Sequence, residues 1–91
     1  MQMVSRQMNE KILRALIDAG AIKKIKITAE GSVIYVEAYT GAEATTAKTT
    51  KGKLKTWSTI DSAAKWVRSL GIGHMQIDVA KWQPYQRRLK V

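Results

Sequence analysis

Two neighbouring segments with alternating side chains constrain the fold of this chain more than any other feature. Each has an apolar residue at every second position, which is the period of a strand with one buried face. The apolar positions are Ile25, Ile27 and Ala29 in the first segment and Ile34, Val36 and Ala38 in the second. Only the turn sequence "EGS" separates the segments, and so short a link excludes a parallel crossover. We therefore predict an antiparallel hairpin.

Apolar residues at helical spacing lie on both sides of this hairpin, and such stripes are typical of amphipathic helices. The first stripe, within residues 5–19, consists of Met8, Ile12, Leu13, Leu16 and Ile17. The second stripe, within "STIDSAAKWVRSLG", consists of Ile60, Ala63, Ala64, Val67 and Leu70. Gly20 and Gly71 follow the stripes, at the position where helices often end. Ser58 and Asp61 have the spacing of a capping box at the start of the second helix.

Two further strands are predicted on either side of the second helix. "KLKTW" places Leu54 and Thr56 on one side and Lys53, Lys55 and Trp57 on the other, and "HMQIDVA" directs Met75, Ile77 and Val79 inward. The order is then α-β-β-β-α-β. Two amphipathic helices need a surface to cover, and one face of a sheet supplies it. We predict an α+β fold of two layers, with two helices on one face of a four-stranded, mainly antiparallel sheet.

The chain is short enough to form a single small domain over residues 1–91. Residues 40–52 show no periodicity and no large apolar side chain, so we expect a mobile basic loop there. Residues 81–91 are expected to form a basic tail, because they carry four Lys and Arg residues and no acid. Pro84 disfavours a central strand in this tail.

The charge balance points to a polyanionic partner. Sixteen Lys and Arg residues stand against seven Asp and Glu, a formal charge of +9. A charge of this kind describes partners rather than fold, and nucleic acid is the partner we expect for a small basic domain. The chain has no cysteine, which excludes disulfides and thiolate metal sites and fits a reducing cytoplasm. Without a long apolar run or signal peptide, we expect a cytoplasmic protein with no membrane partner.

If the helices cover the apolar face of the sheet, the opposite face stays open and carries cations and aromatic rings. Cations bind phosphates, and aromatic rings stack on unpaired bases. We predict a nucleic-acid site formed by this open face, the loop and the tail, with DNA favoured over RNA as the ligand. Its candidate residues are Lys24, Lys26, Tyr35, Tyr39, Lys48, Lys51, Lys53, Lys55, Trp57, Arg87 and Arg88.

The same open face supports a second interpretation. Aromatic residues are enriched in protein interfaces, and lysines also protect edge strands from aggregation. Glu37 and Asp78, on the predicted open face, would weaken phosphate binding there. The alternative is therefore a homodimeric protein-interaction adaptor that docks an acidic partner.

The residue types needed for catalysis or metal binding are not arranged in any recognisable pattern. His74 is the only histidine, and no serine lies in a G-x-S-x-G elbow. The seven acidic residues show no spacing typical of metal ligands, and "GIG" lacks the third glycine and the preceding strand of a phosphate loop. We predict a non-enzymatic protein with no cofactor, no metal and no small-molecule substrate.

The segment "LKTWSTIDSAAKWVRSLGIGHMQIDVAKWQP", Leu54 to Pro84, covers about a third of the chain. It is similar to small partition-associated proteins carried on plasmids and integrative elements. The likeness consists of a strand that ends in an aromatic residue, a helix followed by "LGI", and a short strand followed by a tryptophan and a proline. The resemblance implies a DNA-associated accessory role in plasmid maintenance or transfer, without a diagnostic site residue.

Overall fold

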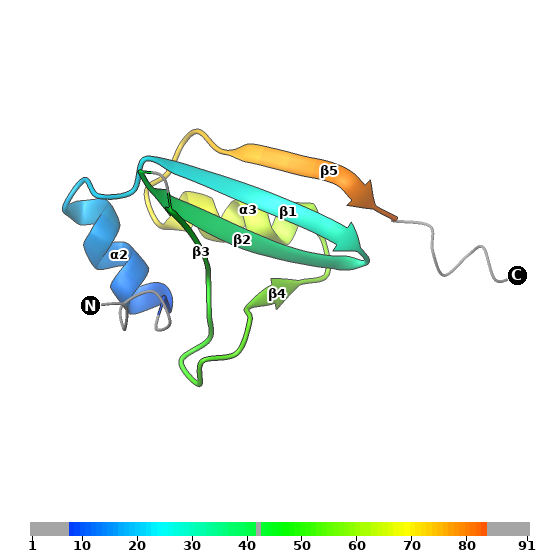
Figure 1. Cartoon of the computed structure of the whole chain (residues 1–91), viewed down its shortest axis with the longest axis horizontal. Coiled ribbons are helices and arrows are strands. Elements are labelled where there is room, and N and C mark those ends of the chain that lie inside the picture. The colour runs from blue at the N-terminus through cyan, green and yellow to red at the C-terminus, as the bar shows by residue number, and fades with distance from the viewer. Residues whose placement is uncertain (1–7, 42, 84–91) are drawn as a thin grey trace, which may run out of the picture.

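The computed structural model of the chain describes residues 8–41 and 43–83. These residues form two helices and a five-stranded sheet (Figure 1). In chain order the elements are α2 (Glu10–Asp18), β1 (Lys24–Gly31), β2 (Val33–Thr40), β3 (Glu43–Thr46), β4 (Thr56–Trp57), α3 (Ile60–Ser69) and β5 (Gln76–Trp82). The predicted α+β class is confirmed.

Each helix is preceded by a residue whose side chain accepts a hydrogen bond from a backbone N–H of the first turn. The Asn9 side chain accepts from the Ile12 amide at 3.0 Å, and Thr59 accepts from Ser62 at 3.0 Å. These bonds satisfy donors that a helix start otherwise leaves unpaired. Thr59 is therefore the cap of α3, and the prediction of Ser58 was one residue early because both have a hydroxyl.

The sheet has the order β3-β2-β1-β5, and β4 pairs with β2 as well. β1 and β2 form the antiparallel hairpin predicted from their alternation, with Ile27 opposite Val36. β5, however, runs parallel to β1, with Ile77 beside Ile27. The predicted count of four strands was wrong, and the sheet is mixed. α3 carries the chain from β4, on one side of the β1–β2 pair, to β5 on the other (Figure 1).

The additional strand, β3, lies in the segment predicted to be a loop. Its residues pair with the end of β2, from Glu37 opposite Thr46 to Thr40 opposite Glu43. Ala47 follows, with its side chain buried and its N–H donated to the Val36 carbonyl at 2.9 Å. The segment has no large apolar residue, so no periodicity marked it, and backbone pairing holds it in the sheet.

The core lies between the sheet and the helices. It contains Met8, Leu13, Ile25, Ile27, Ala29, Ile34, Val36, Ala38, Ala47, Ala63, Val67 and Leu70. α3 contacts β1, β2 and β4, and α2 lies at the end of the sheet where β1 begins (Figure 1). Ile77 and Val79 of β5 were predicted to face the core, yet 49% and 45% of their surfaces are exposed. α3 covers the middle of the sheet and leaves this edge strand largely uncovered.

Candidate nucleic-acid interface

The lysine-rich part of the predicted loop forms a short hairpin between β3 and β4, here called the basic hairpin (residues 47–55). Its two arms are joined by a bridge between Lys48 and Leu54. The Lys55 amide donates to the Ala47 carbonyl at 3.0 Å, and the Thr49 amide donates to Lys53 at 2.7 Å. The hairpin extends away from β1 and β2 (Figure 1), and its base is held by buried Ala47.

The tip of the basic hairpin is a tight turn with a glycine in the position that requires one. The Gly52 amide donates to the Thr49 carbonyl at 2.9 Å, which closes a turn of four residues. Gly52 has a φ of +85°, in the left-handed region that glycine adopts without strain. A turn followed by such a glycine is a standard three-residue hairpin connection. The Thr49 hydroxyl also accepts from the Lys53 amide at 3.2 Å.

The basic hairpin gathers four of the predicted site residues: Lys48, Lys51, Lys53 and Lys55. Lys51 and Lys53 are exposed, whereas Lys48 and Lys55 are half-buried. Among the described residues, none of the four forms an ion pair with a carboxylate. Lys48 lies opposite Leu54, whereas Lys53 and Lys55 flank Leu54 in the chain, so lysines are present on both sides of the ribbon. The hairpin can therefore contact phosphates on either side.

Trp57 does not lie on the open face, as the sequence pattern had suggested. It pairs with buried Ile34, so its ring faces the helix layer. There it packs against Trp66 of α3, with ring centroids 5.0 Å apart and planes tilted by 47°. The assignment of sides in β4 was inverted, and exposed Thr56 occupies the open side, opposite Tyr35. Trp57 is thus packed against the core, not presented as a flat stacking surface.

The Lys55 side chain lies on the same side of the sheet as Trp57, the side of the helices. Its Nζ lies 5.4 Å from the Trp57 ring centroid and 5.6 Å from that of Trp66. A cation at this distance from an indole ring is attracted by the negative face of the ring. The two tryptophans therefore hold the Lys55 ammonium at the base of the basic hairpin.

The open face of the sheet keeps the predicted Lys24, Lys26, Tyr35 and Tyr39, but acids compensate much of its charge. Lys26 Nζ lies 3.8 Å from Glu37 Oε1 and 3.9 Å from Asp78 Oδ2. Glu37 also accepts a hydrogen bond from the Thr28 hydroxyl at 2.9 Å. Lys24 Nζ lies over the Tyr39 ring, 4.4 Å from its centroid. Lys26 and the face of the Tyr39 ring are therefore already engaged within the protein.

On this face, Tyr35 is neutral and Lys26 is charged at ordinary pH. Burial and the nearby carboxylate of Glu30 raise the pKa of Tyr35. Tyr39 makes the largest contribution to the raised pKa of Lys26, followed by the charges of Glu37 and Asp78. The face therefore offers one half-buried ammonium held between two carboxylates, which is a weak site for phosphate.

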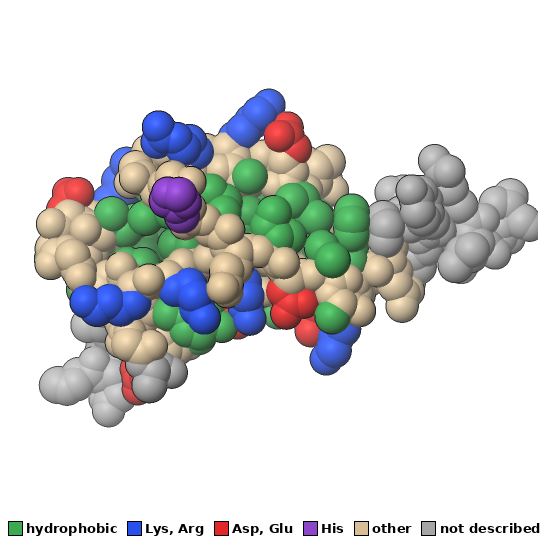
Figure 2. Space-filling view, turned by 90° about the horizontal axis from the view of Figure 1, so that it is seen from above, with side chains coloured by type: hydrophobic (Ala, Val, Ile, Leu, Met, Phe, Trp, Pro, Cys, Tyr) green, Lys and Arg blue, Asp and Glu red, His purple; other side chains and the backbone are tan. Residues whose placement is uncertain are grey.

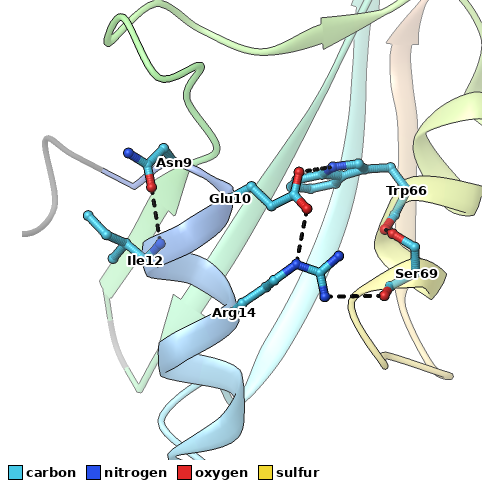
Figure 3. Close-up of polar contacts among 6 residues, drawn as sticks. All are labelled: Asn9, Glu10, Ile12, Arg14, Trp66 and Ser69. Carbon is cyan, nitrogen blue, oxygen red and sulfur yellow. Dashed lines mark hydrogen bonds and ion pairs between the residues drawn. The ribbon is translucent and has the colours of Figure 1, made fainter.

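A polar cluster that the sequence did not indicate joins the two helices (Figure 3). Glu10 of α2 accepts from the Trp66 indole N–H at 3.2 Å and from Arg14 Nε at 3.0 Å. Arg14 reaches the Ser69 carbonyl at 3.5 Å. The hydrogen bonds from Trp66 and then Arg14 lower the pKa of Glu10. This cluster fixes Trp66, on which Trp57 and Lys55 depend for their positions.

A shallow hollow of about 230 Å³ lies where β1 and β5 begin. It is lined by Lys23, Lys24, Ile25, His74, Met75 and Gln76. Two lysines and a histidine at one hollow could donate hydrogen bonds to a phosphate oxygen. No pattern in the sequence indicated this hollow, because Lys23 and Lys24 are about fifty positions from His74 in the chain.

Two predicted residues, Arg87 and Arg88, lie outside the described residues, as does most of the tail to which they belong. Within residues 8–41 and 43–83, no group of His, Cys, Asp and Glu side chains could hold a metal ion. In the same ranges, no helix is long and apolar enough to cross a membrane.

Comparison with known proteins adds no relative to this description. No protein-family model matches the chain, and neither the curated proteins nor the solved structures contain a match. The candidate function therefore depends on the geometry of the site itself.

Proposed function

We propose that this protein is a non-enzymatic nucleic-acid-binding protein that grips the sugar–phosphate backbone through its basic hairpin. The observation that carries the proposal is the concentration of four lysines and no acid on the nine residues of one hairpin. Phosphate neutralisation by such residues supplies most of the affinity in sequence-independent binding. The lysines of the hairpin have no internal carboxylate partner among the described residues, in contrast to Lys26.

The form of the hairpin favours duplex DNA as the ligand. A two-stranded ribbon fits the major groove of B-DNA, whereas the deep and narrow major groove of A-form RNA does not admit side chains. The inward packing of Trp57 also removes one of the rings that base stacking on a single strand would need. The resemblance of Leu54 to Pro84 to partition-associated proteins agrees with a DNA ligand, and we include an accessory role in plasmid maintenance or transfer in the proposal.

The test compares two double variants, each of which removes two lysine charges. Lys51 and Lys53 lie on the basic hairpin, whereas Lys11 and Lys65 are exposed on α2 and α3. Affinity for a short duplex is measured over a range of salt concentrations for each double Lys→Gln variant. Each lost phosphate contact should flatten the slope of log affinity against log salt by about 0.9 on duplex DNA. The Lys51→Gln/Lys53→Gln variant should therefore lose roughly one to two units of slope, and the control variant should keep the slope of the unmodified protein.

Equal flattening by both variants would mean that the protein attracts nucleic acid by net charge and has no site at the hairpin. No binding to single- or double-stranded DNA or RNA at low salt would reject the proposal altogether. The adaptor interpretation would then take its place, and capture of an acidic protein that heparin displaces would support it.

A further inference from the structure

β5 is an edge strand whose outer side has no partner among the described residues. It runs from Gln76 to Trp82 and pairs only with β1. A long free edge offers unpaired backbone groups to another strand, and natural proteins usually protect such edges. Lysine clusters and prolines are common forms of such protection. β5 has neither within its described residues, since Lys81 is its single basic residue.

The side chains of β5 are unusually apolar for an exposed edge. Ile77 is 49% exposed, Val79 is 45% exposed and Trp82 is 36% exposed. They make up three of the five large apolar side chains exposed in the described part of the chain. Figure 2 looks onto the side of the molecule where β5 lies and shows hydrophobic side chains gathered along it, with basic and acidic side chains around them. An apolar surface of this kind marks an interaction site.

The register with β1 shows which side of the sheet each β5 residue occupies. Ile77 lies beside Ile27, and Trp82 lies beside Gly31, both on the helix side. Asp78 lies beside Thr28, and Lys81 lies beside Glu30, both on the open side. Between them β5 has two residues, Val79 and Ala80, where β1 has only Ala29.

This bulge divides β5 into two short segments that are complementary to each other. An antiparallel pair of β5 strands with its two-fold axis between Val79 and Ala80 places Ile77 opposite the partner's Trp82. The same pairing places Asp78 opposite the partner's Lys81, so the charges also match. Both pairs fall on matching sides of the sheet. Val79 and Ala80 of the two copies meet at the two-fold axis, so the bulge interrupts neither of the two short paired segments.

We propose that β5 is a homodimer interface, in which two copies of this chain pair their β5 strands in antiparallel fashion and form one continuous sheet. The contact is isologous, since each residue of one copy meets its counterpart through the two-fold axis. Across the interface Ile77 packs on the partner's Trp82 on the helix side, and Asp78 pairs with the partner's Lys81 on the open side.

Such a dimer has a consequence that rests on the proposed function. β3, and with it the basic hairpin, lies at the edge of the sheet opposite β5. From β3 of one copy to β3 of the other there are seven strand spacings, three in each copy and one across the interface. At about 4.8 Å per spacing this is about 34 Å. One turn of B-DNA is also about 34 Å, the half-site separation used by dimeric DNA-binding proteins. The basic hairpins extend outward beyond these two edges (Figure 1), so a single duplex can contact both hairpins only if it is longer than one turn.

The first test measures the oligomeric state without nucleic acid, so that its result is independent of the proposed function. Sedimentation equilibrium of the full chain should give twice the chain mass of 10.2 kDa. Val79→Lys should give a monomer with unchanged circular dichroism. Val33→Lys is the matched control, because Val33 is a valine of the same sheet with 44% exposure, and it should leave the dimer intact. A monomeric unmodified protein, or equal loss of the dimer in both variants, would overturn the proposal.

The second test uses charge to check the register. Asp78→Lys places lysine opposite the partner's Lys81, and Lys81→Asp places aspartate opposite the partner's Asp78, so each variant alone should be monomeric. Mixed together, they should form a heterodimer in which every charge pair is again complementary. Failure of the mixture to associate, with both variants folded, would rule out this pairing. A duplex of two turns should bind the dimer at least tenfold more tightly than a duplex of one turn, a preference that Val79→Lys should abolish.

Discussion

Replacing Trp57 with alanine should destabilise the fold, because the ring packs against Trp66 and not in solvent. Truncation of a buried tryptophan costs about 3–5 kcal/mol. Trp57 is half-buried, so we expect about 2–3 kcal/mol, of which roughly 0.5–1.5 kcal/mol comes from the tilted pair of rings. A loss of this size is a large share of the stability of a small domain.

Urea unfolding followed by circular dichroism measures this loss. With an m value of about 1–3 kcal/mol per molar, the midpoint should fall by about 1–3 M. Val33→Ala, at a residue that is 44% exposed on β2, should change stability by less than about 0.5 kcal/mol. A double-mutant cycle of Trp57→Ala and Trp66→Ala should show that the two losses are not additive.

An unchanged urea midpoint for Trp57→Ala would refute this reasoning. If the same variant also lost affinity for single-stranded DNA, Trp57 would be a stacking residue on an exposed face, as its alternation with lysines first suggested.

Two further predictions concern positions that only the tertiary structure explains. The hydrogen bond from Trp66 lowers the pKa of Glu10 below its usual 4.5, so Glu10 stabilises the fold above that pH, and this contribution is lost as the pH falls through the lowered pKa. Glu10→Gln should therefore reduce stability near neutral pH and weaken the decline in stability as the pH falls below 4.5. Glu43→Gln, at an exposed position of β3, is the control, and an unchanged pH profile for Glu10→Gln would contradict the role of the carboxylate. Ala47→Asp should unfold the domain, as measured by thermal melting, because it places a charge at a position that is only 2% exposed. Ala44→Asp, at an exposed position of the same segment, should be tolerated. Equal tolerance of both changes would mean that this segment does not pack against the sheet.

Local patterns in the sequence were sufficient to predict the helices and strands that have a strong apolar periodicity. The alternation of β1 and β2 and the short turn between them determine an antiparallel hairpin, because a one-residue slip would turn every apolar residue to the other face. The stripe of α3 likewise predicts its buried residues, and Val67 and Ala63 are fully buried as expected. These features depend on neighbours close in the chain, which the sequence displays directly.

Long-range pairing was decided only by the tertiary structure. β3 has no apolar period, and its place in the sheet comes from backbone hydrogen bonds to β2, which any side chains allow. The side on which Trp57 lies depends on the register of a two-residue strand, since a shift of one position inverts it. The exposure of Ile77 and Val79 depends on the reach of α3 across the sheet.

For the lysines of the basic hairpin, the sequence likewise determined one part and the tertiary structure the other. Their number and the lack of an acid among them are evident in the sequence, and both indicate a polyanionic partner. Their arrangement on one hairpin, apart from the compensated charges of the open face, arises because buried Ala47 anchors the hairpin and the Gly52 turn closes it. Composition thus predicts the kind of partner, whereas the pairing of distant backbone segments decides where the lysines lie.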